Sequence, residues 1–332
     1  MHKLTVTTSP HIHSGATTRR IMLDVIIALI PAFIAATIFF GPVVLRLAAV
    51  TISAAVLFEW IFCRIMKRDT SSIFDLTAVV TGLIMVLGIP SNTPMWISVV
   101  GVGVAIIVVK QLFGGVGRNL FNPALVGHIV VLKLAAYGPD FQPAHPWLAI
   151  YGTDYPLAMS WLDFINYPGV YAVTSATPLQ LLADGTQLPS LGELFLGIHA
   201  GVMGETSILA LLLGGCYLVW RRVISPIIPL IFIGTAILFV TLAGQDPLIH
   251  LLSGSLVFVA IFMATDYATS PINKKGKVIF AIGCGLITAW IRLYGSTTEG
   301  VTMALIIMNL LTPLIEKLTL PKTFGQGKVS RI

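Results

Sequence analysis

Long apolar runs, separated by short polar segments, follow one another along most of the chain. Most of them are close to the roughly 20 residues that an α-helix needs to cross the hydrocarbon core of a bilayer. The third and fifth runs are shortened or interrupted by glycine and proline, which is typical of broken helices in membranes. The pattern predicts an all-α integral membrane protein with about ten transmembrane helices. The runs cover residues 21–40, 43–63, 73–89, 95–113, 123–136, 207–220, 227–243, 248–265, 278–293 and 301–318.

Composition supports this class and excludes others. Of the 332 residues, 56% are hydrophobic and 10% are charged, and the mean hydropathy is +0.92. Such a chain is neither a soluble globule nor intrinsically disordered, since disorder requires low hydrophobicity and high charge. Its three cysteines are too few for a disulfide scaffold of this length. The net charge of +6 is scattered between the apolar runs, so we expect a lipid bilayer and not nucleic acid as the partner.

The positions of Lys and Arg test the number of spans independently, because cytoplasmic loops are enriched in these residues. With ten spans, all of them fall on one side of the membrane except Arg46, Lys133 and Arg292. An odd number of spans in either half would destroy this alternation. We therefore expect two groups of five spans, with the N and C termini in the cytoplasm.

One long polar segment separates the two groups. It has no Lys or Arg between Lys133 and Arg221, but it carries Asp140, Asp154, Asp163, Asp184, Glu193 and Glu205. Residues 138–206 are therefore expected on the outer face of the membrane, in the periplasm or outside the cell.

Hydroxyl side chains gather within this outer segment, where Thr174, Ser175 and Ala176 precede Thr177 and Pro178. Thr177 is placed to be the N-cap of a short helix with Pro178 at its first position. From spacing alone, an ordinary helix cap or turn explains these residues. The alternative is that hydroxyls at a helix N-terminus hold a phosphate group or form an ester with it.

Two further breaks lie at the membrane edge. Glycines at 114, 115 and 117 lead to Asn122, which precedes Pro123 and is expected to cap the fifth helix; Thr265 and Asp266 close the eighth run. A further glycine-containing break lies at 253–255. Such breaks either are tight loops or line a cavity near a repeat interface, where ligands and ions bind.

Ionisable residues inside apolar runs are candidates for an ion or proton path, because burying a charge in a membrane is costly. Glu59 and His128 lie deepest in their runs and are the candidates for that path. Four further residues lie near the cytoplasmic edge, where snorkelling or pairing explains them: Asp24, Asp75, Asp266 and Lys110. The cysteines and histidines show no cluster or metal-binding spacing, so we expect neither a metal site nor catalytic residues.

Several motifs, in order along nearly the whole chain, resemble the family that contains the RnfD proteins of Rnf electron-transport complexes and the NqrB proteins of sodium-pumping NADH:quinone reductases. They are SPHIHSG at 9–15, RIMLD at 20–24, KQLFGG at 110–115, FNPA at 121–124, SATPL at 175–179, FMATD at 262–266 and TSP at 269–271. The short segment before the first run favours the RnfD branch over the NADH:quinone reductase branch.

The resemblance implies a fold of two inverted five-helix repeats, similar to urea transporters. It implies a cytoplasmic segment at 1–20, repeats at 21–137 and 207–318, the outer loop at 138–206 and a cytoplasmic tail at 319–332. It also implies that FMN is joined through its phosphate to Thr177 by a flavin transferase, with a second, noncovalent flavin such as riboflavin. The expected location is the cytoplasmic (inner) membrane of a bacterium or archaeon.

By the same resemblance, the chain relays electrons between ferredoxin and NAD(H), coupled to Na⁺ or H⁺ translocation, together with the A, B, C, E and G components of the Rnf complex. The sequence has neither a dinucleotide-binding glycine motif after a strand nor iron–sulfur ligand spacing, so these partners must supply those sites. Two alternatives remain: an NqrB-like component of a sodium-pumping NADH:quinone reductase, and a solute channel or transporter of the same architecture.

Overall fold

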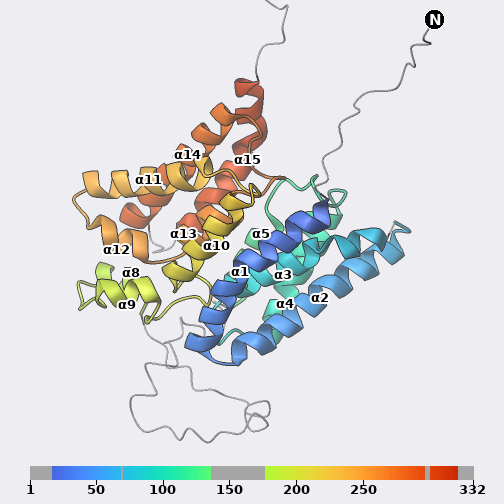
Figure 1. Cartoon of the computed structure of the whole chain (residues 1–332), viewed down its shortest axis with the longest axis horizontal. Coiled ribbons are helices and arrows are strands. Elements are labelled where there is room, and N and C mark those ends of the chain that lie inside the picture. The colour runs from blue at the N-terminus through green and yellow to red at the C-terminus, as the bar shows by residue number, and fades with distance from the viewer. Residues whose placement is uncertain (1–16, 69, 136–175, 296–299, 321–332) are drawn as a thin grey trace, which may run out of the picture.

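The computed structural model describes residues 17–68, 70–135, 176–295 and 300–320, and within these ranges the chain is all-helical (Figure 1). Four helices are long and apolar enough to cross a membrane. They are α1 (Thr18–Phe40), α2 (Val43–Ile65), α14 (Lys274–Tyr294) and α15 (Val301–Thr319). Much of their surface is apolar and exposed, as expected where a helix faces lipid.

The remaining apolar runs form shorter or divided helices. They are α3 (Thr77–Leu87), α4 (Met95–Gly103) continued by the π-helix η2 (Val104–Gln111), α5 (Pro123–Ala135), α10 (Ile208–Trp220) and α11 (Ile227–Leu242). The eighth run is split into α12 (Pro247–Leu252) and α13 (Leu256–Phe258), the latter continued by the π-helix η3 (Val259–Met263). A 3₁₀ turn, η1 (Thr70–Asp75), precedes α3, and two short helices, α8 (Pro178–Ala183) and α9 (Leu191–Leu196), precede α10.

Each predicted run thus contains helix, and the interruptions have local causes. In the third run, α3 ends at Leu87 with Gly88 as its C-cap, and the prolines at 90 and 94 remove backbone donors from the segment that follows. In the eighth run, Gly254 adopts a φ of +69°, a left-handed conformation that glycine takes without strain. At both interruptions, backbone N–H and C=O groups inside the apolar body lose their intrahelical hydrogen-bond partners.

At the first interruption, the other half of the chain supplies the missing partners. The Gly204 N–H donates to the Leu87 carbonyl at 2.7 Å, and the Met203 N–H donates to the Ile89 carbonyl at 3.4 Å. All four residues are buried. The segment before α10 therefore closes the end of α3, as a buried break in a membrane protein requires.

The two halves also meet where α1 packs against α10 (Figure 1). Gly214 of α10 lies directly against the backbone of α1, and a Cβ there would overlap the Ala28 carbonyl oxygen. Small residues of this kind let two membrane helices approach closely. The close contact between α1 and α10 therefore requires glycine at position 214.

We expect Gly214→Val to destabilise the protein by about 3 kcal/mol or more, because the added side chain meets backbone that cannot move aside. The matched control is Gly234→Val in α11, where a Cβ would meet nothing within 4 Å. Thermal unfolding of the purified protein in detergent compares the two variants. Equal midpoints for both variants would contradict the close packing of α1 against α10.

Candidate functional site

A cavity of about 810 Å³, counted with the space at its open mouth, lies between the two halves of the chain. Apolar side chains of α1, α10 and η3, such as Val25, Leu218 and Phe262, form part of its wall. Its polar lining is Thr77, Thr81, Lys110, Asn119, Asn122, Thr265 and Asp266. The structure thus brings Asn122, Thr265 and Asp266, which the sequence nominated from separate breaks, to one cavity.

Asn122 joins the two halves at this cavity. Its Oδ1 accepts hydrogen bonds from the N–H groups of Ala124 at 3.0 Å and Leu125 at 3.4 Å, which makes it the N-cap of α5 as predicted. Its Nδ2 donates to the carbonyl of Met263, the last residue of η3, at 3.2 Å. One buried carboxamide therefore satisfies backbone groups at the start of one broken helix and at the end of another.

Thr265 and Asp266 follow η3 at the cavity wall. The Thr265 hydroxyl donates to the Ile261 carbonyl at 2.6 Å. The Asp266 carboxylate accepts from the Ala268 N–H at 3.4 Å and from the Thr269 hydroxyl at 3.1 Å. These bonds fix the turn after η3, so that the carboxylate lines the cavity in one orientation.

Lys110, at the end of η2, connects the cavity to a buried charge. Its Nζ donates to Glu59 Oε1 at 2.8 Å and to Thr77 Oγ1 at 2.7 Å. Gln111 Nε2 donates to the same Glu59 oxygen at 2.9 Å. The Lys110 and Glu59 side chains are only 3% and 0% exposed. Since Lys110 also lines the cavity, Glu59 is one contact away from it.

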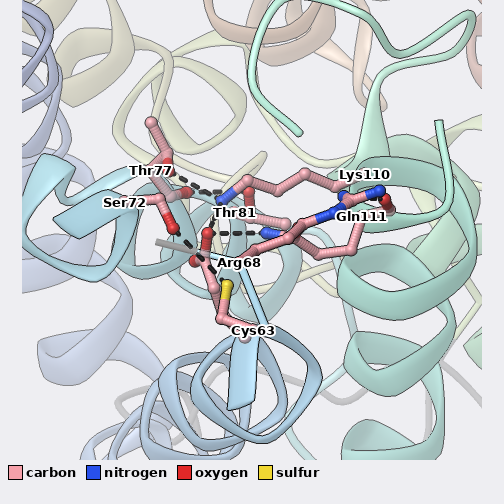
Figure 2. A network of polar contacts seen from close by, with 8 residues as sticks. Cys63, Arg68, Ser72, Thr77, Thr81, Lys110 and Gln111 are labelled. Carbon is pink, nitrogen blue, oxygen red and sulfur yellow. Dashed lines mark hydrogen bonds and ion pairs between the residues drawn. The ribbon is translucent and has the colours of Figure 1, made fainter. Parts of the chain in front are cut away.

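Further bonds surround this ion pair (Figure 2). The Arg68 guanidinium donates to the Gln111 carbonyl at 2.9 Å, and the Thr81 hydroxyl donates to the Thr77 carbonyl at 2.9 Å. The network therefore ties α2, α3 and η2 together around the pair. Glu59 Oε2 has no hydrogen-bond partner among the described residues. The pair is thus neutral in charge but leaves one buried acceptor unused.

His128, the second residue nominated for an ion path, does not line the cavity or join the network. It is buried on α5 and faces Gly88, at the end of α3. Neither ring nitrogen has a hydrogen-bond partner within the described ranges. The structure therefore places the two ion-path candidates in different surroundings, with Glu59 beside the cavity and His128 beside the first helix interruption.

Thr177 is the N-cap of α8, with Pro178 at the first helical position, as predicted. Its Oγ1 accepts from the Gln180 N–H at 3.3 Å, and its own N–H donates to Gln180 Oε1 at 2.9 Å. The helix packs against α12. Ala176 lies in the described chain, but Thr174 and Ser175 lie outside it, so their part in the motif remains a prediction.

A second cap in the same region has the same geometry. Ser190 is the N-cap of α9; its Oγ accepts from the Glu193 N–H at 3.3 Å, and Glu193 Oε2 accepts from the Ser190 N–H at 2.8 Å and hydroxyl at 2.9 Å. These bonds, first the one from the backbone N–H, hold the pKa of Glu193 below its ordinary value. Cap geometry therefore does not by itself distinguish Thr177, and Ser190 is a natural control for it.

Sequence reasoning explained Lys110 as a snorkelling or paired residue at the membrane edge; the structure shows that it is paired, but its partner, Glu59, and its place at the cavity were missed. Lys110 and Glu59 are 51 positions apart, so no local pattern joins them. The one available signal was that each is a lone charge in an apolar run.

Interrupted helices that meet at a largely apolar cavity with a few polar groups, within an otherwise apolar helical body, are typical of an integral membrane protein. The chain belongs to the NQR2, RnfD, RnfE family, whose sequence profile matches residues 5–325. This finding confirms the family membership that the motifs predicted.

Named relatives cover the chain almost from end to end, and each is the D component of an ion-translocating complex. The one from the Na(+)-translocating ferredoxin:NAD(+) oxidoreductase complex of Acetobacterium woodii is 42% identical, over 99% of this chain and 97% of the relative. The one from the proton-translocating ferredoxin:NAD(+) oxidoreductase complex of Clostridium ljungdahlii is 35% identical, over 97% and 96%. The one from the ion-translocating oxidoreductase complex of Actinobacillus succinogenes is 33% identical, over 97% and 98%.

Removing the ammonium of the buried pair tests the network. We expect Lys110→Met to destabilise the protein by about 3–5 kcal/mol, because it leaves the Glu59 carboxylate buried without a counter-charge. Adding Glu59→Gln to Lys110→Met should restore most of the loss, since the double variant buries no charge. Thermal unfolding in detergent measures both variants, with Lys275→Met, at an exposed lysine of α14, as the control. A single variant as stable as this control would show that the pair does not form.

Proposed function

We propose that the chain is the RnfD-type membrane component of an Rnf complex that transfers electrons between ferredoxin and NAD(H) and couples this transfer to ion translocation. Similarity over nearly the full length supports the proposal, since two of the three relatives are named for ferredoxin:NAD(+) oxidoreductase complexes and all three for ion translocation. The chain is one subunit of an enzyme complex, and the A, B, C, E and G components supply the ferredoxin and NAD sites.

The proposed topology is ten spans in two inverted repeats, with both termini in the cytoplasm and residues 138–206 outside. One of the three basic residues that this topology places on the outer side has a structural role there, which supports the topology. Arg292, on the outer side in this topology, donates to the His250 carbonyl at 2.7 Å and to the Ser253 carbonyl at 3.1 Å. It therefore satisfies carbonyls at the end of α12, a role independent of its contribution to orientation.

We propose that FMN is esterified through its phosphate to Thr177 by a flavin transferase. The observation that carries this proposal is the resemblance of residues 175–179 to the family motif, and the position of the hydroxyl is compatible with it: Thr177 Oγ1 is the N-cap oxygen of α8. Esterification replaces the hydroxyl proton but keeps this oxygen as the acceptor of the Gln180 N–H bond. The amide groups of the first turn and the dipole of the helix favour a phosphate there. The flavin supplies one-electron chemistry, and Thr177 acts only as its anchor.

The cavity between the halves is the proposed site of the second, noncovalent flavin, for which riboflavin is the candidate. Its mixture of apolar walls and few polar groups suits a planar ring with a polar edge. The Thr265 oxygen and the Asp266 carboxylate would accept hydrogen bonds from the ligand, and Lys110 would donate one. Asn122 would shape the site, since its carboxamide already bonds to both halves.

The ion path is proposed to include Glu59 and His128. The unused oxygen of Glu59 and the unpartnered ring of His128 support this assignment, because both are buried polar groups with free acceptor capacity among the described residues. The relatives' names include both Na⁺ and H⁺, so similarity leaves the identity of the ion open.

In-gel flavin fluorescence of the denatured chain tests the FMN assignment. With a flavin transferase coexpressed, the native chain and Ser190→Ala should fluoresce, Thr177→Val should not, and Thr177→Ser should retain the cap and some fluorescence. Fluorescence that persists in Thr177→Val would place the flavin elsewhere. A native chain without any chromophore would favour the solute channel or transporter.

If the second flavin binds in the cavity between the halves, a cavity variant should lose only the noncovalent flavin. Asp266→Leu should remove the flavin that acid extraction releases from the complex while leaving the covalent fluorescence intact, because it removes a polar wall of the cavity far in sequence from Thr177. Asp246→Leu, which changes the exposed N-cap of α12, is the matched control. If chromatography of the extracts finds the same amount of free flavin in both variants, the cavity does not hold it.

A further inference from the structure

A second cavity opens beside the first, between the beginning of α1 and the end of α10. It has a volume of about 760 Å³, counted with its open mouth. We call it the arginine pocket and define it by Arg20, Asp24, Arg221, Arg222 and Tyr267, which line it. Tyr267 also lines the first cavity, but the polar residues assigned above to flavin do not reach the arginine pocket.

Three arginines but only one carboxylate line the arginine pocket. Its single carboxylate, Asp24, accepts from Arg221 Nε at 3.2 Å and Arg221 Nη2 at 3.3 Å, and also from the Tyr217 hydroxyl at 3.0 Å. The side chains of Arg20 and Arg222 have no hydrogen-bond or ion-pair partner in the part of the chain that the structure describes. Two guanidinium groups are therefore available to an anion.

An exposed apolar stripe runs along α1 from this pocket. It follows Arg20 at helical spacing and consists of Leu23, Ile27, Ile30, Ile34 and Ile38. Arg20 and Ile30 are ten positions apart on α1, which corresponds to about 15 Å at a rise of 1.5 Å per residue. This length is about half of a hydrocarbon core of roughly 30 Å, which is the depth of one leaflet.

The end of α10 also marks the membrane interface. Trp220 is 78% exposed and lies directly before Arg221. Tryptophan is enriched at the level of the lipid headgroups, where its ring is partly in water and partly in the apolar layer. The guanidinium groups of the pocket are therefore at headgroup height, on the side that the excess of Lys and Arg assigns to the cytoplasm.

We propose that the arginine pocket binds the phosphate of an anionic phospholipid of the cytoplasmic leaflet, with an acyl chain lying along the stripe of α1. A guanidinium group matches the oxygens of a phosphate in a bidentate geometry. Basic pockets between transmembrane helices on the cytoplasmic side are the recognised setting for anionic headgroups. The stripe distinguishes a phospholipid from a free phosphate ion, which would make no use of it.

Such a lipid would reinforce the interface between the halves. The bonds from Arg221 and Tyr217 to Asp24 already tie the end of α10 to the beginning of α1. A phosphate held by Arg20 of α1 and Arg222 after α10 adds a second bridge between the same two helices. The bound lipid is therefore expected to stabilise the wall that Tyr267 shares with the flavin cavity.

The experiment is native mass spectrometry of the purified complex titrated with phosphatidylglycerol and, separately, with phosphatidylcholine. Phosphatidylglycerol should bind preferentially and raise the thermal midpoint. Arg20→Gln combined with Arg222→Gln should weaken its binding by about thirtyfold, as expected for two basic residues near an anionic surface. The control is Arg19→Gln combined with Arg64→Gln, which makes the same charge change at exposed arginines outside the pocket and should bind as the native complex does.

Equal binding by the pocket variant and the control variant would overturn the proposal. So would equal binding of the two lipids, or displacement of phosphatidylglycerol by inorganic phosphate at equal concentration, which would identify a free phosphate as the ligand. If the double pocket variant does not assemble, Arg20→Gln and Arg222→Gln are measured singly and should each weaken binding about fivefold. Arg20→Lys should bind more tightly than Arg20→Gln but less tightly than the native complex, because it keeps the charge and loses the bidentate geometry.

Discussion

The structure depends on one constraint: each interrupted helix must find partners for its backbone polar groups inside an apolar body. The chain meets this requirement by using one half to complete the other. Gly204, before α10, closes the end of α3, and the Asn122 carboxamide caps α5 while it bonds to the last carbonyl of η3. The breaks therefore join the halves, in addition to the packing of α1 against α10. The cavity lies at this junction because helices that stop there leave space between them.

The same junction concentrates the buried polar chemistry of the chain. Lys110 reaches the cavity from the end of one π-helix, and Asp266 follows the other, so both π-helices end at the same site. π-Helical segments occur frequently at functional sites, since they redirect the side chains that follow. Behind Lys110, Glu59 supplies a counter-charge that lies beyond the reach of solvent. A ligand in this cavity would therefore contact the only described lysine whose charge is shared with a buried carboxylate.

The sequence predicted features with local causes. Hydropathy located the helices, and the Asn122–Pro123 and Thr177–Pro178 pairs correctly marked the starts of α5 and α8, because cap chemistry is read within a few residues. The sequence could not predict which charges meet. Glu59 and Lys110 are 51 positions apart, and Asp24 and Arg221 are 197 apart, so their pairing depends on helix packing that periodicity does not encode. Motif resemblance, and not physics, brought flavin to Thr177, since the equivalent cap at Ser190 has the same geometry.

The proposal that matters most for function is that this chain is a flavoprotein whose outer segment carries FMN on Thr177. The most direct measurement is the mass of the peptide that contains Thr177, from a complex isolated from its native membrane. Chymotrypsin is the suitable protease, because no Lys or Arg lies between Lys133 and Arg221. We predict a peptide heavier by one FMN in phosphoester linkage, with the added mass assigned to Thr177. A Thr177 peptide found only in unmodified form would contradict the proposal.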